Sequence, residues 1–210
     1  MSSVTLSRAS GLALLLGSLL VLLGFVFRVL AAPSTPTPTQ LASAQYVSSA
    51  VLGFSGVALL LFGSIGLVAR LAELAGWLGL AGALLLFLSG VVFAGISGYN
   101  FLASPWYAVH APNAAAQVAA YGTPAVVVAA YVATWLVFAG AVLVEIAMLR
   151  ARLRAAWAGW LIVGGAAFGL LFDYVLFNPF VFLVAVVLAI LGLGWLAYAL
   201  LSAKGGSPAH

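Results

Sequence analysis

The stretch "GLALLLGSLLVLLGFVFRVL" at residues 11–30 decides the fold class, because Arg28 is its only charged residue. A helix crosses a bilayer core with about 20 mostly apolar residues, and this stretch meets that requirement. The whole chain has the same character. It is 66% hydrophobic and 5% charged, whereas a soluble domain carries roughly 25% charged residues. We therefore expect an integral membrane protein.

Five further apolar segments are long enough to cross a bilayer, which predicts an all-α bundle of six transmembrane helices. The expected spans are about 9–31, 40–68, 75–98, 124–148, 156–176 and 179–202, in one domain over residues 1–210. The first is too long for a signal peptide, so we expect it to remain. Three boundaries are supported by Thr37-Pro38, Thr123-Pro124 and Asn178-Pro179, since a capping side chain followed by proline suits a helix start.

The positions of lysine and arginine predict that both termini are cytoplasmic. The inner side then receives Arg8, Arg70, Arg150, Arg152, Arg154 and Lys204. The outer side receives only Arg28. We therefore expect a multi-pass protein of the cell membrane, in particular of a prokaryotic inner membrane.

The longest predicted loop, 99–123, is outside in this topology. Asn113 can begin a short helix there, and Trp106 and Tyr107 are expected to anchor it at the headgroups. An alternative is that the loop is a lid over an outward-facing cavity.

The tetrapeptide "AGWL" occurs at 75–78 and again at 158–161. This repetition suggests that a two-helix hairpin is duplicated, with copies at about 41–98 and 124–176, as in some transporter folds. The alternative is chance similarity in Ala/Gly/Leu-rich sequence. Trp77 and Trp160 would then recur because tryptophan favours the membrane interface.

Small residues recur along the predicted spans at intervals of four or seven positions. Close helix packing in lipid depends on such residues, so we expect protein contacts at Gly17, Gly24, Gly56, Gly63, Gly90, Gly165 and Gly169. Arg28 is four residues after Gly24, and Asp173 is four after Gly169, so both continue a packing stripe. We predict that Arg28 and Asp173 pair at the outer ends of the first and fifth spans, because an unpaired charge at membrane depth is costly. A substrate or proton site at this pair is the alternative, and Glu145 is expected to reach the inner surface.

Several kinds of chemistry are not expected. The chain has no cysteine, and His110 and His210 lie in a loop and at the C-terminus. No predicted span therefore contains a thiolate or imidazole ligand, and we expect no metal, no cofactor and no catalytic residues. The few charges are scattered, so nucleic acid is not an expected partner.

Three segments of the chain resemble segments of uncharacterised six-span membrane proteins of bacteria. They are "SRASGLALLLGSLL", "ARLAELAGWLGLAG" and "RAAWAGWL". The resemblance covers most of the chain and implies the six-helix fold. It implies no activity, because that family has none to transfer.

The expected role is a non-catalytic accessory or scaffold subunit that packs against other membrane subunits or a second copy of itself within the bilayer. The alternative is a small-solute transporter or a membrane substrate-binding subunit, with its site near Arg28 and Asp173. A cavity reaching these residues would favour the alternative, and a fully packed interior would favour the scaffold.

Overall fold

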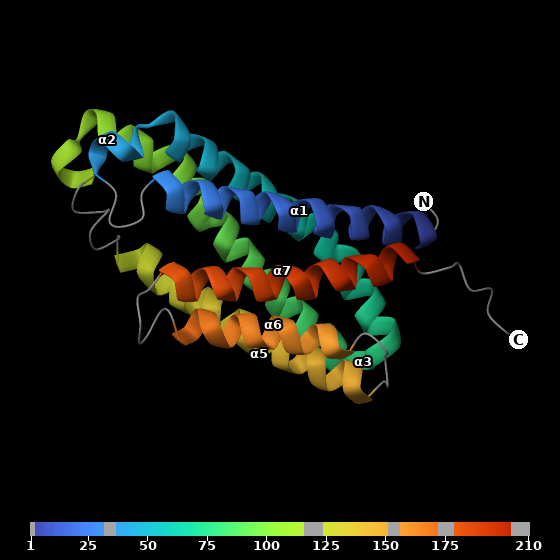
Figure 1. The fold of residues 1–210 in the computed structure, drawn as a ribbon. Coiled ribbons are helices and arrows are strands. Elements are labelled where there is room, and N and C mark those ends of the chain that lie inside the picture. The colour runs from blue at the N-terminus through green and yellow to red at the C-terminus, as the bar shows by residue number, and fades with distance from the viewer. Residues whose placement is uncertain (1–2, 32–36, 116–123, 151–155, 172–178, 203–210) are drawn as a thin grey trace, which may run out of the picture.

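A computed structural model describes residues 3–31, 37–115, 124–150, 156–171 and 179–202, and these ranges contain helices and no strand (Figure 1). The helices are α1 (Ser3–Ala31), α2 (Pro38–Leu41), α3 (Ala44–His110), α5 (Pro124–Arg150), α6 (Ala156–Leu171) and α7 (Pro179–Ser202). Residues 112–115 are also helical. The predicted all-helical class is confirmed for the described residues.

Helix α3 contains 67 residues and reverses its direction at Gly76, where φ is 62° and ψ is −152°. A straight helix of that length would extend about 100 Å, several times the thickness of a bilayer core. The reversal instead produces two antiparallel halves, Ala44–Glu73 and Ala75–His110. The rings of Phe54 and Phe101 stack across these halves with centroids 6.3 Å apart.

The helical segments form a closed ring. Helix α1 packs on α3, α3 on α5, α5 on α6, α6 on α7, and α7 returns to α1. Figure 1 shows that α1 begins and α7 ends at the same end of the bundle, which we call the terminal end. The opposite end, where α2 lies, is called the distal end.

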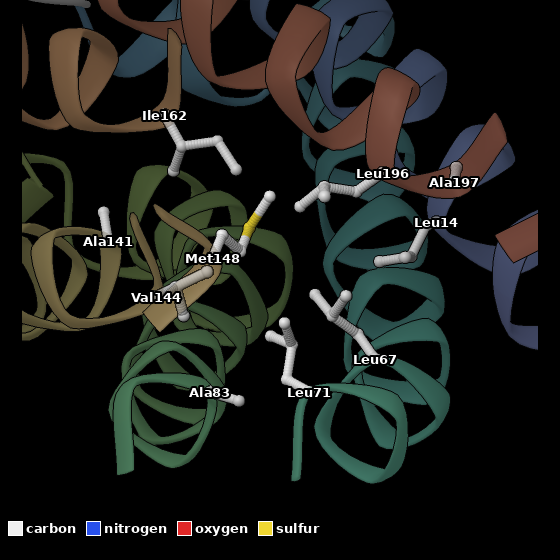
Figure 2. Packing of buried hydrophobic residues seen from close by; sticks show 10 residues of the cluster. All are labelled: Leu14, Leu67, Leu71, Ala83, Ala141, Val144, Met148, Ile162, Leu196 and Ala197. Carbon is white, nitrogen blue, oxygen red and sulfur yellow. The ribbon is translucent and has the colours of Figure 1, made fainter. Parts of the chain in front are cut away.

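Two packed clusters of buried side chains lie at the two ends of this ring. The terminal cluster contains Leu14, Leu67, Leu71, Ala83, Ala141, Val144, Met148, Ile162, Leu196 and Ala197 (Figure 2). The distal cluster contains Leu41, Tyr46, Ala108 and Ala115. Side chains from all five long helices meet in the terminal cluster, so that end of the bundle is closed by direct packing.

Four segments are long and apolar enough to cross a membrane: Thr5–Leu30, Ala44–Glu73, Ala75–His110 and Ala125–Arg150. Two shorter apolar stretches, Gly159–Leu171 and Leu183–Tyr198, belong to α6 and α7. Large apolar side chains on the outer surfaces of these helices are exposed, as expected for a surface in contact with lipid rather than water. The chain is therefore a membrane-protein candidate, and these four helices are its candidate spans.

The predicted helix starts agree with the structure at Pro124 and Pro179. Thr37 also caps a helix, in a capping box with Gln40, but that helix is the four-residue α2. Ser43 then caps α3 by accepting a hydrogen bond from the Tyr46 amide. The second long helix therefore begins at Ala44 rather than near residue 40.

The segment 99–123, expected as a loop, is helical through His110 because α3 continues past Pro105. Proline removes one backbone hydrogen bond within a helix. The extension nevertheless packs at the distal end, where Ala108 joins Tyr46 in the distal cluster. Residues 116–123 lie outside the described residues.

Candidate functional site

A cavity of about 400 Å³ lies inside the ring, between the two clusters. Helices α1, α3, α5, α6 and α7 all contribute lining residues. Leu14, Leu67 and Ile162 of the terminal cluster line one end, and Tyr46 of the distal cluster lines the other. The volume falls within the range of about 300–1,000 Å³ that is typical of small-molecule sites.

The wall of the cavity is mostly apolar, and its hydroxyl groups are Ser49, Ser64, Ser89, Ser97 and Thr134. Four of these hydroxyls donate to backbone carbonyl oxygens. The distances are 2.6 Å for Ser49, 2.7 Å for Ser64, 3.0 Å for Ser89 and 2.9 Å for Thr134. Because these donors already have acceptors, the wall presents little hydrogen-bonding capacity to a polar solute.

Arg28 is the charged residue of the cavity lining, and among the described lining residues it alone is exposed. The cavity therefore reaches the surface of the described bundle at Arg28. The guanidinium carbon lies 5.7 Å from the ring centroid of Tyr46, in a cation–π contact. Tyr46 is 3% exposed, so the distal cluster fixes the ring on which the arginine rests.

The predicted partner of Arg28, Asp173, lies outside the described residues. The structure therefore places one member of the predicted ion pair at the distal mouth of the cavity. The pairing itself stays a prediction.

Tyr99 adds a second polar group at the distal end. It lies near Tyr46 and Tyr107, and its hydroxyl is buried without a hydrogen-bond partner among the described residues. A buried hydroxyl without a partner costs free energy. The distal end thus contains a positive charge and an unsatisfied hydroxyl close to the same buried tyrosine ring.

The prediction that Glu145 reaches the inner surface is wrong. This residue is only 3% exposed, and neither carboxyl oxygen has a hydrogen-bond partner among the described residues. It lies against Gly159 of α6, where an added Cβ would overlap the carboxyl oxygen Oε2. The contact between α5 and α6 holds the side chain inside the bundle, and the sequence of α5 alone gives no sign of this neighbour.

The glycines predicted for helix packing all lie against neighbouring segments. A Cβ built on Gly17 would lie 2.8 Å from the Gly56 carbonyl oxygen, and one on Gly24 would lie 2.7 Å from the Gly53 amide nitrogen. The other predicted positions face these neighbours: Gly56 faces Gly17 and Val21, Gly63 faces Leu14, Gly90 faces Leu61, Gly165 faces Ala185 and Ala189, and Gly169 faces Thr134. Backbones of α1 and α3 therefore meet directly.

The aromatic residues predicted as interface anchors lie on the outer surface. Trp77 is 75% exposed and Trp160 is 60% exposed. Trp106 and Tyr107 are also exposed, and they pack edge to face. Such positions are suitable for contact with lipid headgroups, and anchoring itself stays a prediction.

Among the described residues, no group of three or more His, Cys, Asp or Glu side chains could hold a metal ion. His110 stacks on Trp106, and its Nδ1 lies 3.0 Å from the Trp106 carbonyl oxygen. The cavity is therefore the described feature best suited to bind another molecule.

A scan against protein-family models, and searches of curated proteins and of solved structures, found no match for this chain. The resemblance to six-span bacterial membrane proteins stays a prediction.

Proposed function

We propose that the protein is a six-span integral membrane protein that binds a small apolar molecule in its central cavity, as a transporter or a substrate-binding membrane subunit. The observation that carries this proposal is the cavity itself: it is mostly apolar, is closed by the packed terminal cluster at one end, and opens beside the distal cluster at Arg28. A packed scaffold has no need of such a space, because empty volume in a core destabilises the fold.

The six-span topology with cytoplasmic termini is part of the proposal. It is supported by the alternation of helix directions around the ring and by the start of α1 and the end of α7 at one end (Figure 1). The described cations Arg8 and Arg150 belong to that same end, which agrees with the positive-inside rule. Labelling of single cysteines at position 8 and position 109 from each side of the membrane tests it.

Duplication of a two-helix hairpin also stays a proposal. The two "AGWL" tetrapeptides differ in local structure, since Gly76 has a positive φ and Gly159 lies within α6. A shared ancestry of the hairpins therefore requires that the turn at Gly76 and the connection before α6 diverged.

Val57 and Val51 provide a matched test of binding. Val57 lines the cavity, whereas Val51 lies six residues earlier on α3 and is 38% exposed. We expect Val57→Phe to reduce photo-crosslinking of the cavity wall by a long-chain alcohol carrying a diazirine about fivefold, because the larger ring fills a site of this size. Val51→Phe should leave it unchanged.

The crosslinks are mapped by mass spectrometry on the full chain in vesicles, with Phe93 and Val137 as reporter positions in the wall. Unlabelled long-chain alcohol should compete for the signal at these positions. Equal labelling of the wall and of lipid-facing residues, without competition, would refute a binding site.

An accessory role is the second candidate, and one observation favours it. Trp157, Trp195 and Tyr198 form an exposed aromatic cluster on α6 and α7, with successive ring centroids 4.6 Å and 5.5 Å apart. Clustered exposed aromatics suit contact with another membrane helix as well as with headgroups. Gentle purification from the native membrane tests this role, since a stoichiometric partner would support it and a lone protein would not.

A further inference from the structure

Arg28 places a positive charge at the distal mouth of the cavity, and the other described lining residues are uncharged. The contact of Arg28 with the Tyr46 ring is a cation–π interaction, and such a contact does not use the five N–H donors of the guanidinium. No hydrogen bond joins these donors to another residue within the described ranges. Arginine donors arranged in a planar fork bind carboxylate and phosphate oxygens especially well.

The wall behind Arg28 excludes most other ligand chemistries. Four of its five hydroxyls donate to backbone carbonyls, so a sugar or an amino acid would lose most of its hydrogen bonds to water without replacing them. An apolar chain has no hydrogen bonds to lose when it enters the cavity. A ligand that satisfies both parts of the site is charged at one end and apolar along the rest.

We propose that the cavity holds a single-chain amphiphile, with its anionic oxygens on the guanidinium of Arg28 and its chain among Val57, Phe93 and Val137. This inference rests on the proposed function and names its ligand class. Carboxylate and phosphate heads share the required chemistry. A volume of about 400 Å³ is near the lower limit of small-molecule sites, which favours one chain over the paired chains of a phospholipid.

The inference is compatible with the predicted pairing of Arg28 and Asp173. A guanidinium has five donors and can serve two anions, so a carboxylate of the chain and the head of a ligand can share it. The predicted outer position of Arg28 would then place the ligand head at the membrane surface, where a charge is least costly.

Three photoreactive probes of equal chain length test the head group: an alkyl carboxylate, an alkyl phosphate and the uncharged alcohol. The full chain is reconstituted in vesicles at pH 8, and each unlabelled compound competes against its own probe. We expect the anionic compounds to compete at Phe93 and Val137 about tenfold better than the alcohol, the scale of one charge-assisted hydrogen bond.

Arg28→Gln should remove this tenfold advantage and leave labelling by the alcohol intact, which also reports that the variant is folded. Arg28→Lys should keep a large part of the advantage because it keeps the charge. Arg8→Gln is the matched control, since Arg8 is an exposed arginine of the same helix outside the cavity. It should behave as the unaltered protein does.

The outcomes separate this inference from the proposed function. If all three probes label the wall equally and Arg28→Gln changes nothing, the cavity binds apolar molecules and the anionic head is wrong. If one anionic probe keeps the advantage and the other does not, the head is assigned to that chemistry. If no probe is competed from the wall, both the binding function and the ligand class are wrong.

Discussion

Helix α3 borders two contrasting regions, the close contact with α1 and the open cavity. Gly56 lies in the contact, where an added Cβ would come within 2.7 Å of the Val21 amide nitrogen. Gly53, one turn earlier, touches Gly24 of α1 through its backbone, but it also lines the cavity, and an added Cβ there would meet no atom within 4 Å. Small residues thus have two roles in this bundle. Some allow backbones to touch, and others keep a space between them.

The largest expected effect comes from closing the gap that Gly56 leaves for α1. Gly56→Ala places a methyl group against backbone atoms, so α1 and α3 must move apart, at a cost of about 1–3 kcal/mol. Gly53→Ala should change stability by less than about 1 kcal/mol, and in a stabilising direction, because alanine favours helix. Unfolding of the two variants in detergent measures the difference. Equal stability would show that the contrast between the regions is wrong.

The next effect concerns the distal mouth. A double-mutant cycle with Arg28→Gln and Asp173→Asn should give a coupling free energy above about 1 kcal/mol, because exposed pairs give about 0.2–1 kcal/mol and this pair is predicted near membrane depth. Denaturant unfolding of the four proteins measures it. A coupling free energy near zero would contradict the pairing of Arg28 with Asp173, and the proposed ligand would then be the remaining anionic partner of Arg28.

Glu145 tests the opposite end, where no space is left. Glu145→Met should be neutral or stabilise the protein by up to about 1 kcal/mol, because an apolar group of similar shape replaces two carboxyl oxygens that have no hydrogen-bond partner among the described residues. The measurement is again unfolding in detergent, with the exposed Glu73→Met as control. A clear loss of stability would mean that the carboxyl has a favourable interaction in the membrane.

The smallest expected effect separates two buried serines. Ser89 is 0% exposed and donates to the Ala133 carbonyl of α5, whereas the hydroxyl of Ser18, at 2% exposed, has no partner among the described residues. Ser89→Ala should cost about 0.6 kcal/mol, the average for such bonds in a membrane bundle. Ser18→Ala should cost nothing. Reversal of this order would contradict the assignment of the α3–α5 bond.

The sequence predicted what local chemistry determines. Pro124 and Pro179 begin helices because proline fits the first turn, and Thr37 caps a helix because its hydroxyl accepts from the Gln40 amide. Prediction from the sequence failed where contact with a second helix determines the structure. Glu145 is buried by Gly159 of another helix, and the segment after residue 98 stays helical while packing against the start of α3.

The cavity was beyond prediction from sequence for a related reason. Its wall comes from five helices, and no spacing within one helix distinguishes a small residue that touches a neighbour from one that borders a space. Ser49 lies seven residues before Gly56, at the spacing typical of a packing stripe, yet Ser49 lines the cavity and Gly56 lies against α1. The available signal was the recurrence of serine beside glycine on the inward faces, and its meaning depends on the neighbouring helix.

Gly76 has a consequence of a different kind, which concerns handedness. The chain contains 23 glycines, and within the described ranges Gly76 is the one with a positive φ. An added Cβ there would meet no atom within 4 Å, so space does not exclude a side chain. The backbone angles exclude it, since they belong to a region that L-amino acids rarely enter. A D-alanine at this position would suit the turn, whereas an L-alanine would oppose the hairpin. The antiparallel arrangement of α3 therefore depends on the one residue type that has no chirality.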